Sequence, residues 1–193
     1  MPKDKPRKID TVGENMRAIF SEAEKAVQEY GTRNPFELLE SIGAIIWITY
    51  DFEPDGLKGF ATIMNGISYA GINGNLPEQD MLIAAGHEAA HLILHKNEIL
   101  NSPAYSIKDF NLYDNSGKLE FEANSFLADF LVSDEQVMDV ITNPDRDYFS
   151  AAKELCIPPD LLAFKLYSMI RRGFDLINPA VVQSRFLKKS RMW

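Results

Sequence analysis

All three histidines of the chain lie within nine residues, in the stretch AGHEAAHLILH at positions 85–95. Apolar residues flank this His-Glu-x-x-His pattern and no proline interrupts it, so it predicts a helix. Residues four apart share one helix face, which brings His87 and His91 side by side. Two imidazoles at that spacing can bind one metal ion, and Glu88 next to them is the carboxylate that a hydrolytic base requires. The stretch therefore indicates metal-assisted hydrolysis.

A catalytic zinc site needs three protein ligands and an open position for water, so another ligand must come from elsewhere. The candidates are His95, a carboxylate on the helix predicted at residues 118–132, and an acidic residue in the expected loop 96–117. His95 lies about 12 Å along the helix axis from His87 at the usual rise per residue, which strains a tetrahedral site. We expect His95 to be a supporting residue at the end of the helix.

The predicted helix 118–132 offers two glutamates, Glu120 and Glu122, which point about 160° apart around its axis. One of them can face the metal while the other faces solvent. Glu120 shares a face with Asn124, one turn later, and an amide there could hydrogen-bond a metal-bound histidine. We therefore predict Glu120 as the third ligand, with Glu122 as the alternative.

The elements that must position these residues indicate an α+β fold. Three strand-like runs at residues 44–50, 58–64 and 67–72 precede the histidine helix, and Asn65-Gly66 is a two-residue hairpin signal. We expect a small, mostly antiparallel three-stranded sheet packed against a helical core with extra C-terminal helices. The expected helices are residues 14–30, 35–41, 78–95, 118–132, 134–141, 147–155 and 159–173.

The length and composition are those of one globular domain. The chain has 193 residues, of which 46% are hydrophobic and 25% charged. We expect a single domain at residues 13–173, a poorly ordered N-terminal tail at 1–12 and a C-terminal tail at 174–193. No run approaches 18 uninterrupted apolar residues, so we expect no membrane span. The single cysteine, Cys156, fits a reducing compartment, and we expect a cytoplasmic protein.

The net charge of −8 argues against nonspecific nucleic-acid binding by the body of the protein. Residues 147–157 and 159–172 allow a second interpretation as a helix-turn-helix. The second of these helices has few polar side chains suited to reading bases beyond Lys165, Arg171 and Arg172. We therefore expect this helix to pack against the body, and we expect no direct nucleic-acid binding.

Two segments resemble the signature helices of the ImmA/IrrE family of metallo-endopeptidases. They are GHEAAHLILH at 86–95 and EFEANSFLADFLV at 120–132. The family pattern is a HELGHLLLH-like helix followed by an E-x-x-A-N-x-F-A-x-x-L-L helix, and the likeness covers roughly residues 36–170. Ala89-Ala90 replaces the commoner Leu-Gly, and the second helix lacks the usual following proline.

The resemblance implies a zincin-like core with zinc bound by His87, His91 and Glu120, and with Glu88 as the catalytic acid/base. Zinc lowers the pKa of a bound water to about 7, and the glutamate passes the proton to the leaving amine. Members of the family occur largely in bacteria, phages and mobile elements, and typically cut a partner DNA-binding repressor. The resemblance thus implies a zinc endopeptidase that acts on a helix-turn-helix repressor. The alternative is a non-cleaving regulatory or toxin–antitoxin-type binding protein on the same metal-binding fold.

Overall fold

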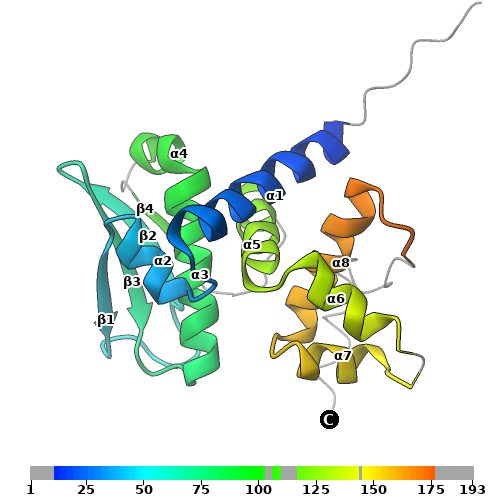
Figure 1. Cartoon of the computed structure of the whole chain (residues 1–193). Helices are drawn as coiled ribbons and strands as arrows, with labels where there is room; N and C mark the ends of the chain where they lie inside the picture. Colours follow the sequence, from blue (N-terminus) through cyan, green and yellow to red (C-terminus); the bar gives the residue numbers. More distant parts are fainter. Residues whose placement is uncertain (1–10, 103–105, 110–116, 144, 177–193) are drawn as a thin grey trace, which may run out of the picture.

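The computed structural model describes residues 11–102, 106–109, 117–143 and 145–176, and in these it confirms the α+β class (Figure 1). Of the expected tails at 1–12 and 174–193, residues 1–10 and 177–193 lie outside the described residues. The elements are α1 (Thr11–Tyr30), α2 (Pro35–Ser41), β1 (Ile45–Thr49), β2 (Gly59–Met64), β3 (Ile67–Asn73), α3 (Glu78–Leu94), α4 (Lys96–Asn101), β4 (Ser106–Asp109), α5 (Lys118–Leu131), α6 (Asp134–Ile141), α7 (Tyr148–Glu154) and α8 (Pro159–Arg172).

The sheet has the strand order β1-β3-β2-β4. The β2–β3 hairpin turns at Asn65 and Gly66, whose φ angles of 52° and 78° are both positive, as a type I′ turn requires. β4 adds to β2 in antiparallel orientation, whereas β1 runs parallel to β3. The prediction is therefore correct for the hairpin, but the observed sheet has one further strand, β4, and one parallel pair, β1 with β3.

The stretch 96–117, which we expected to be a loop, contains regular structure in its described part. Residues 96–101 form α4, which follows directly on α3, and residues 106–109 form β4. Both elements are short, and each is held by tertiary contact: Ile99 of α4 is fully buried, and β4 bonds along β2. Such short segments carry too few residues for a periodic signal.

The helix α3 lies in the middle of the fold, between the sheet and α5. Figure 1 shows the sheet on one side of α3 and the C-terminal helices α6 to α8 on the far side of α5. Small and branched side chains of β2 and β3 are buried where these strands pack against α3, among them Ala61, Ile63, Ala70 and Ile72. The long helix α1 crosses α5 and reaches α8. The motif helix is thus buried on several sides.

A buried group of charges joins α5, α6 and α8. The Lys165 ammonium lies 2.9 Å from Asp129 Oδ1 and 2.8 Å from Asp134 Oδ1. Arg172 forms two hydrogen bonds of 2.6 and 2.7 Å with Asp134, and Ser168 donates one of 2.6 Å to Asp129. Burial opposes ionisation of Asp134, but its bonds to Arg172 and Lys165 outweigh this and lower the pKa of that carboxyl below its usual range.

The same contacts argue against interpreting residues 147–157 and 159–172 as a helix-turn-helix. Lys165, expected to be one of the few groups able to read bases, is fully buried in ion pairs, and Arg172 is committed to Asp134. The expected packing of this helix against the body is confirmed by its contacts with α1 and α5. Within the described residues, no helix combines the length and apolarity needed to cross a bilayer.

Replacing Lys165 by Met should destabilise the fold strongly, because the buried Asp129 carboxyl, whose pKa burial already raises, would lose its nearest counter-ion. We expect the free energy of unfolding to fall by about 3–5 kcal/mol, measured by urea denaturation. Lys153→Met, at an exposed lysine of α7, is the matched control and should change it by less than about 0.5 kcal/mol. A loss below about 1 kcal/mol in Lys165→Met would contradict this account of the charge group.

Candidate metal centre

The helix α3 presents its polar motif inside the protein. It begins after Pro77 with Glu78 and Asp80 in its first turn, where carboxylates interact favourably with the helix dipole. Further along, His87, Glu88 and His91 are each fully buried. Buried polar side chains of this kind are normally paired or bind a ligand, which marks this part of α3 as a site rather than as ordinary core.

The second helix of the site, α5, packs closely against α3. The contact is close at Gly86, where an added Cβ would lie 2.3 Å from Leu127 Cδ1. Gly86 thus has no side chain where α5 crosses, directly before the first histidine of the motif. The close approach lets a side chain from the start of α5 reach His87 and His91.

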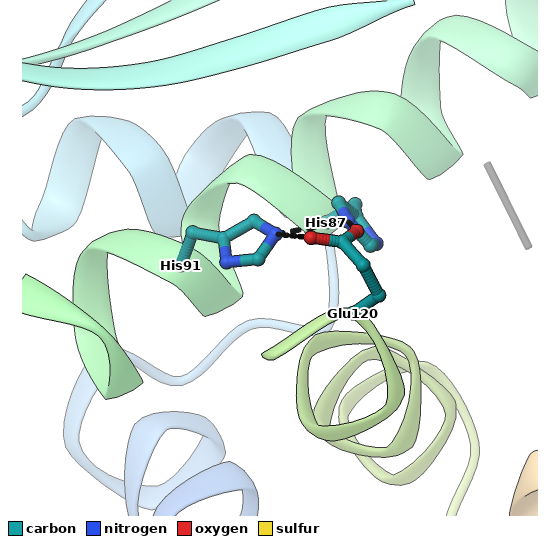
Figure 2. A group of neighbouring side chains, drawn as sticks. All are labelled: His87, His91 and Glu120. Carbon is teal, nitrogen blue, oxygen red and sulfur yellow. Dashed lines mark hydrogen bonds and ion pairs between the residues drawn. The ribbon is translucent and has the colours of Figure 1, made fainter. Parts of the chain in front are cut away.

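That side chain is Glu120, and the three groups converge on one point (Figure 2). His87 Nε2 lies 3.0 Å from His91 Nε2 and 3.1 Å from Glu120 Oε2, and Glu120 Oε1 lies 3.7 Å from His91 Nε2. Two ligands of one tetrahedral zinc ion lie about 3.3 Å apart, given metal–ligand distances near 2.0–2.1 Å. The two imidazole nitrogens and the carboxylate could therefore hold one metal ion.

The ring nitrogen of His87 that faces away from this point, Nδ1, has a hydrogen-bond partner as well. His87 Nδ1 lies 3.1 Å from the side-chain oxygen of Asn124, one turn after Glu120 on the same helix. An amide oxygen accepts, so the ring proton of His87 sits on Nδ1 and the lone pair of Nε2 faces the convergence point. Asn124 is fully buried and holds the ring in this orientation.

The expectation that one glutamate faces solvent is wrong. Glu122 is only 8% exposed, and its Oε2 lies 3.1 Å from His95 Nε2. His95 itself is 2% exposed, and its Nδ1 lies 2.8 Å from His91 Nδ1. Glu122 is held between His95, at the end of α3, and Asn15 of α1. Glu120 rather than Glu122 therefore reaches the inner nitrogens of His87 and His91.

Glu88 points toward the sheet, against a residue that the sequence analysis did not identify. An added Cβ at Gly59, the first residue of β2, would lie only 2.3 Å from Glu88 Oε1. The backbone of β2 thus passes directly beside the carboxylate. A glycine in a strand-like run is a known sign of close approach by another group, and this was the signal available in the sequence.

The fold and these contacts define a class: an α+β domain in which two helices bring two histidines and a glutamate together as a possible site for a single metal ion. Residues 63–167 match the model of the IrrE N-terminal-like domain, a peptidase family, over more than half of the chain. The chain belongs to this metallopeptidase family, as the resemblance predicted. Neither the curated proteins nor the solved structures contain a match.

The matched segment contains both helices of the site. It begins inside β2 and ends inside α8, so it includes α3 and α5 completely. The helices α1 and α2, the strand β1 and the start of β2 lie before it. Gly59, which touches Glu88, therefore belongs to the part of the chain outside the match.

Glu120→Ala should abolish tight metal binding, because two imidazoles alone leave the site without its carboxylate. Loss of a residue that hydrogen-bonds a metal ligand can weaken metal binding by about 100-fold. We expect the loss of Glu120, a ligand itself, to weaken it more. Isothermal titration calorimetry with Zn²⁺ measures the metal affinity. Glu135→Ala, at an exposed glutamate of α6, should bind as wild type does. Wild-type affinity in Glu120→Ala would refute Glu120 as a ligand.

Proposed function

We propose that the protein is a zinc-dependent endopeptidase with His87, His91 and Glu120 as metal ligands and Glu88 as general acid/base. The observation that carries the proposal is the convergence of two imidazole nitrogens and one carboxylate beside a buried glutamate. Two histidines and a glutamate are a donor set used by catalytic zinc in peptidases. The donor set leaves one position of a tetrahedral ion for water or substrate.

Zinc bound there would supply a Lewis acid that polarises the scissile carbonyl and makes water acidic enough to react near neutral pH. The side chains do the remaining work. Glu88 takes the proton of the attacking water and then gives it to the leaving amine. Asn124 holds the ring of His87 so that its Nε2 stays directed inward.

We further propose that the substrate is a protein, a helix-turn-helix repressor of a phage or mobile element. Membership of a peptidase family supports a protein substrate, while the choice of a repressor follows from the resemblance of the two signature helices. Direct nucleic-acid binding is not part of this proposal, since the chain carries a net charge of −8. The cytoplasmic location stays a prediction.

A second function is a regulatory or toxin–antitoxin-type protein that binds its partner without cutting it. It would use the same fold and metal ligands. The intact Glu88 favours the peptidase, because a binding protein has no chemical need for a buried carboxylate beside the metal ligands.

Glu88→Gln should separate the two functions, because it removes the base and keeps the shape of the side chain. Full-length repressor encoded next to this protein should disappear on co-expression with wild type and persist with Glu88→Gln. Immunoblotting of a tagged repressor measures this. Equal loss of full-length repressor with wild type and with Glu88→Gln would refute the peptidase proposal. Persistence of full-length repressor with both would favour the binding function.

Gly59→Ala should slow cleavage while zinc binding stays intact, because the three atoms nearest to the new methyl group all belong to Glu88, whose carboxylate it displaces. A displacement of about 1 Å in a reacting group can cost about 100-fold in rate, and we expect a loss of that order. Glu135→Ala, at an exposed residue of α6, is the control and should cleave as wild type does. Wild-type cleavage by Gly59→Ala would contradict the assigned role of Glu88.

A further inference from the structure

A run of hydrogen-bonded side chains leads from the metal ligands to the first helix of the protein. His91 Nδ1 lies 2.8 Å from His95 Nδ1, and His95 Nε2 lies 3.1 Å from Glu122 Oε2. The other oxygen of Glu122 accepts a hydrogen bond of 2.9 Å from the Asn15 side chain on α1. We call these four residues the relay. It connects α3, α5 and α1 at the level of the site.

The proton positions along the relay follow from one condition, that His91 binds the metal through the lone pair of Nε2. A neutral imidazole carries a single N–H, so a His91 that offers the lone pair of Nε2 must hold its proton on Nδ1. His95 Nδ1 then has to accept, which places the proton of His95 on Nε2. From there it is donated to the Glu122 carboxylate, whose second oxygen accepts from Asn15. Every contact therefore pairs one donor with one acceptor.

We propose that His95 and Glu122 are positioning residues for His91, and that Asn15 fixes Glu122 from the N-terminal helix. This inference rests on the proposed function in one respect, namely that His91 binds the metal through Nε2. It adds a helix to the metal site that lies before the matched segment 63–167. The α1 helix thus contributes to metal binding indirectly, through Glu122 and His95, besides covering the core.

Burial explains why the relay matters energetically. His91 and His95 are 0% and 2% exposed, so the outer N–H of His91 has no access to bulk water. If His95 could not accept, that N–H would lose this buried hydrogen-bond partner, and losing one partner of a buried hydrogen bond costs about 1–3 kcal/mol. Outer partners of metal-binding histidines typically change metal affinity by about 10–100-fold, which is the size of effect we expect.

A lysine also contacts the Glu122 carboxylate and provides a contrast. Lys118 Nζ lies 3.7 Å from Glu122 Oε1, but its side chain is 79% exposed. Exposed ion pairs contribute little because water screens them. Asn15 is also an exposed residue, but its hydrogen bond of 2.9 Å to Glu122 is partly buried, so the relay predicts that Asn15 matters for metal affinity and that Lys118 does not.

The test compares His95→Phe with His95→Gln in the full chain, using Zn²⁺ and Co²⁺ as probes. Phenylalanine keeps the ring volume and removes both hydrogen bonds, whereas glutamine can accept from His91 and donate to Glu122. We expect about 10–100-fold weaker zinc binding in His95→Phe and recovery of most of that loss in His95→Gln. The visible absorption of bound Co²⁺ should change in His95→Phe and return toward wild type in His95→Gln.

The contribution of α1 is tested by Asn15→Ala, with Glu14→Ala and Lys118→Ala as matched controls on exposed neighbours. Loss of one hydrogen bond should weaken zinc binding about threefold to tenfold in Asn15→Ala. Both controls should stay within about twofold of wild type. An Asn15→Ala affinity equal to that of the controls would remove α1 from the relay.

Equal zinc affinity in wild type and His95→Phe would overturn the proposal, and so would equal losses in His95→Phe and His95→Gln. A wild-type protein that binds zinc and cleaves its substrate, with both variants unaffected, would refute the relay and leave the peptidase intact. A wild-type protein that binds no zinc would refute the proposed function together with the relay.

Discussion

The close packing of α5 against α3 is the contact on which the rest of the site depends. The motif helix carries His87, Glu88 and His91, and the third candidate ligand comes from α5, which begins at Lys118, 24 residues after Leu94 at the end of α3. The approach is possible because Gly86 has no side chain where Leu127 crosses it. The same contact brings Asn124 to His87 and Glu122 to His95. The helix α5 thus supplies the Glu120 carboxylate, the outer partner of His87 and the carboxylate that His95 contacts.

The surrounding layers hold this pair of helices from two directions. On one side, the backbone of β2 passes beside Glu88 at Gly59, so the sheet limits where the buried carboxylate can point. On the other side, α1 crosses α5 and reaches Glu122 through Asn15. Farther away, the ion pairs of Lys165 and Arg172 join the C-terminal end of α5 and the start of α6 to α8. The buried polar groups are therefore distributed along the whole length of α5.

Strong local signals were sufficient for much of this arrangement. Periodicity predicted the helices of the site, Asn65-Gly66 predicted the hairpin, and the spacing of Glu120 and Asn124 predicted that both share one helix face. The missing parts depend on tertiary contact: β4 exists through its pairing with β2, and β1 runs parallel to β3 without any local sign of it. The burial of Glu122 depends on α1, whose position relative to α5 no periodic pattern encodes.

The central claim is that one metal ion is bound between His87, His91 and Glu120. The most direct measurement is an anomalous difference map from crystals grown with zinc, with data collected at the zinc absorption edge. The account predicts one strong peak about 2.0–2.1 Å from the Nε2 atoms of both histidines and within bonding distance of the Glu120 carboxylate. A peak bound by Glu122 instead, or no peak between the two histidines, would contradict it.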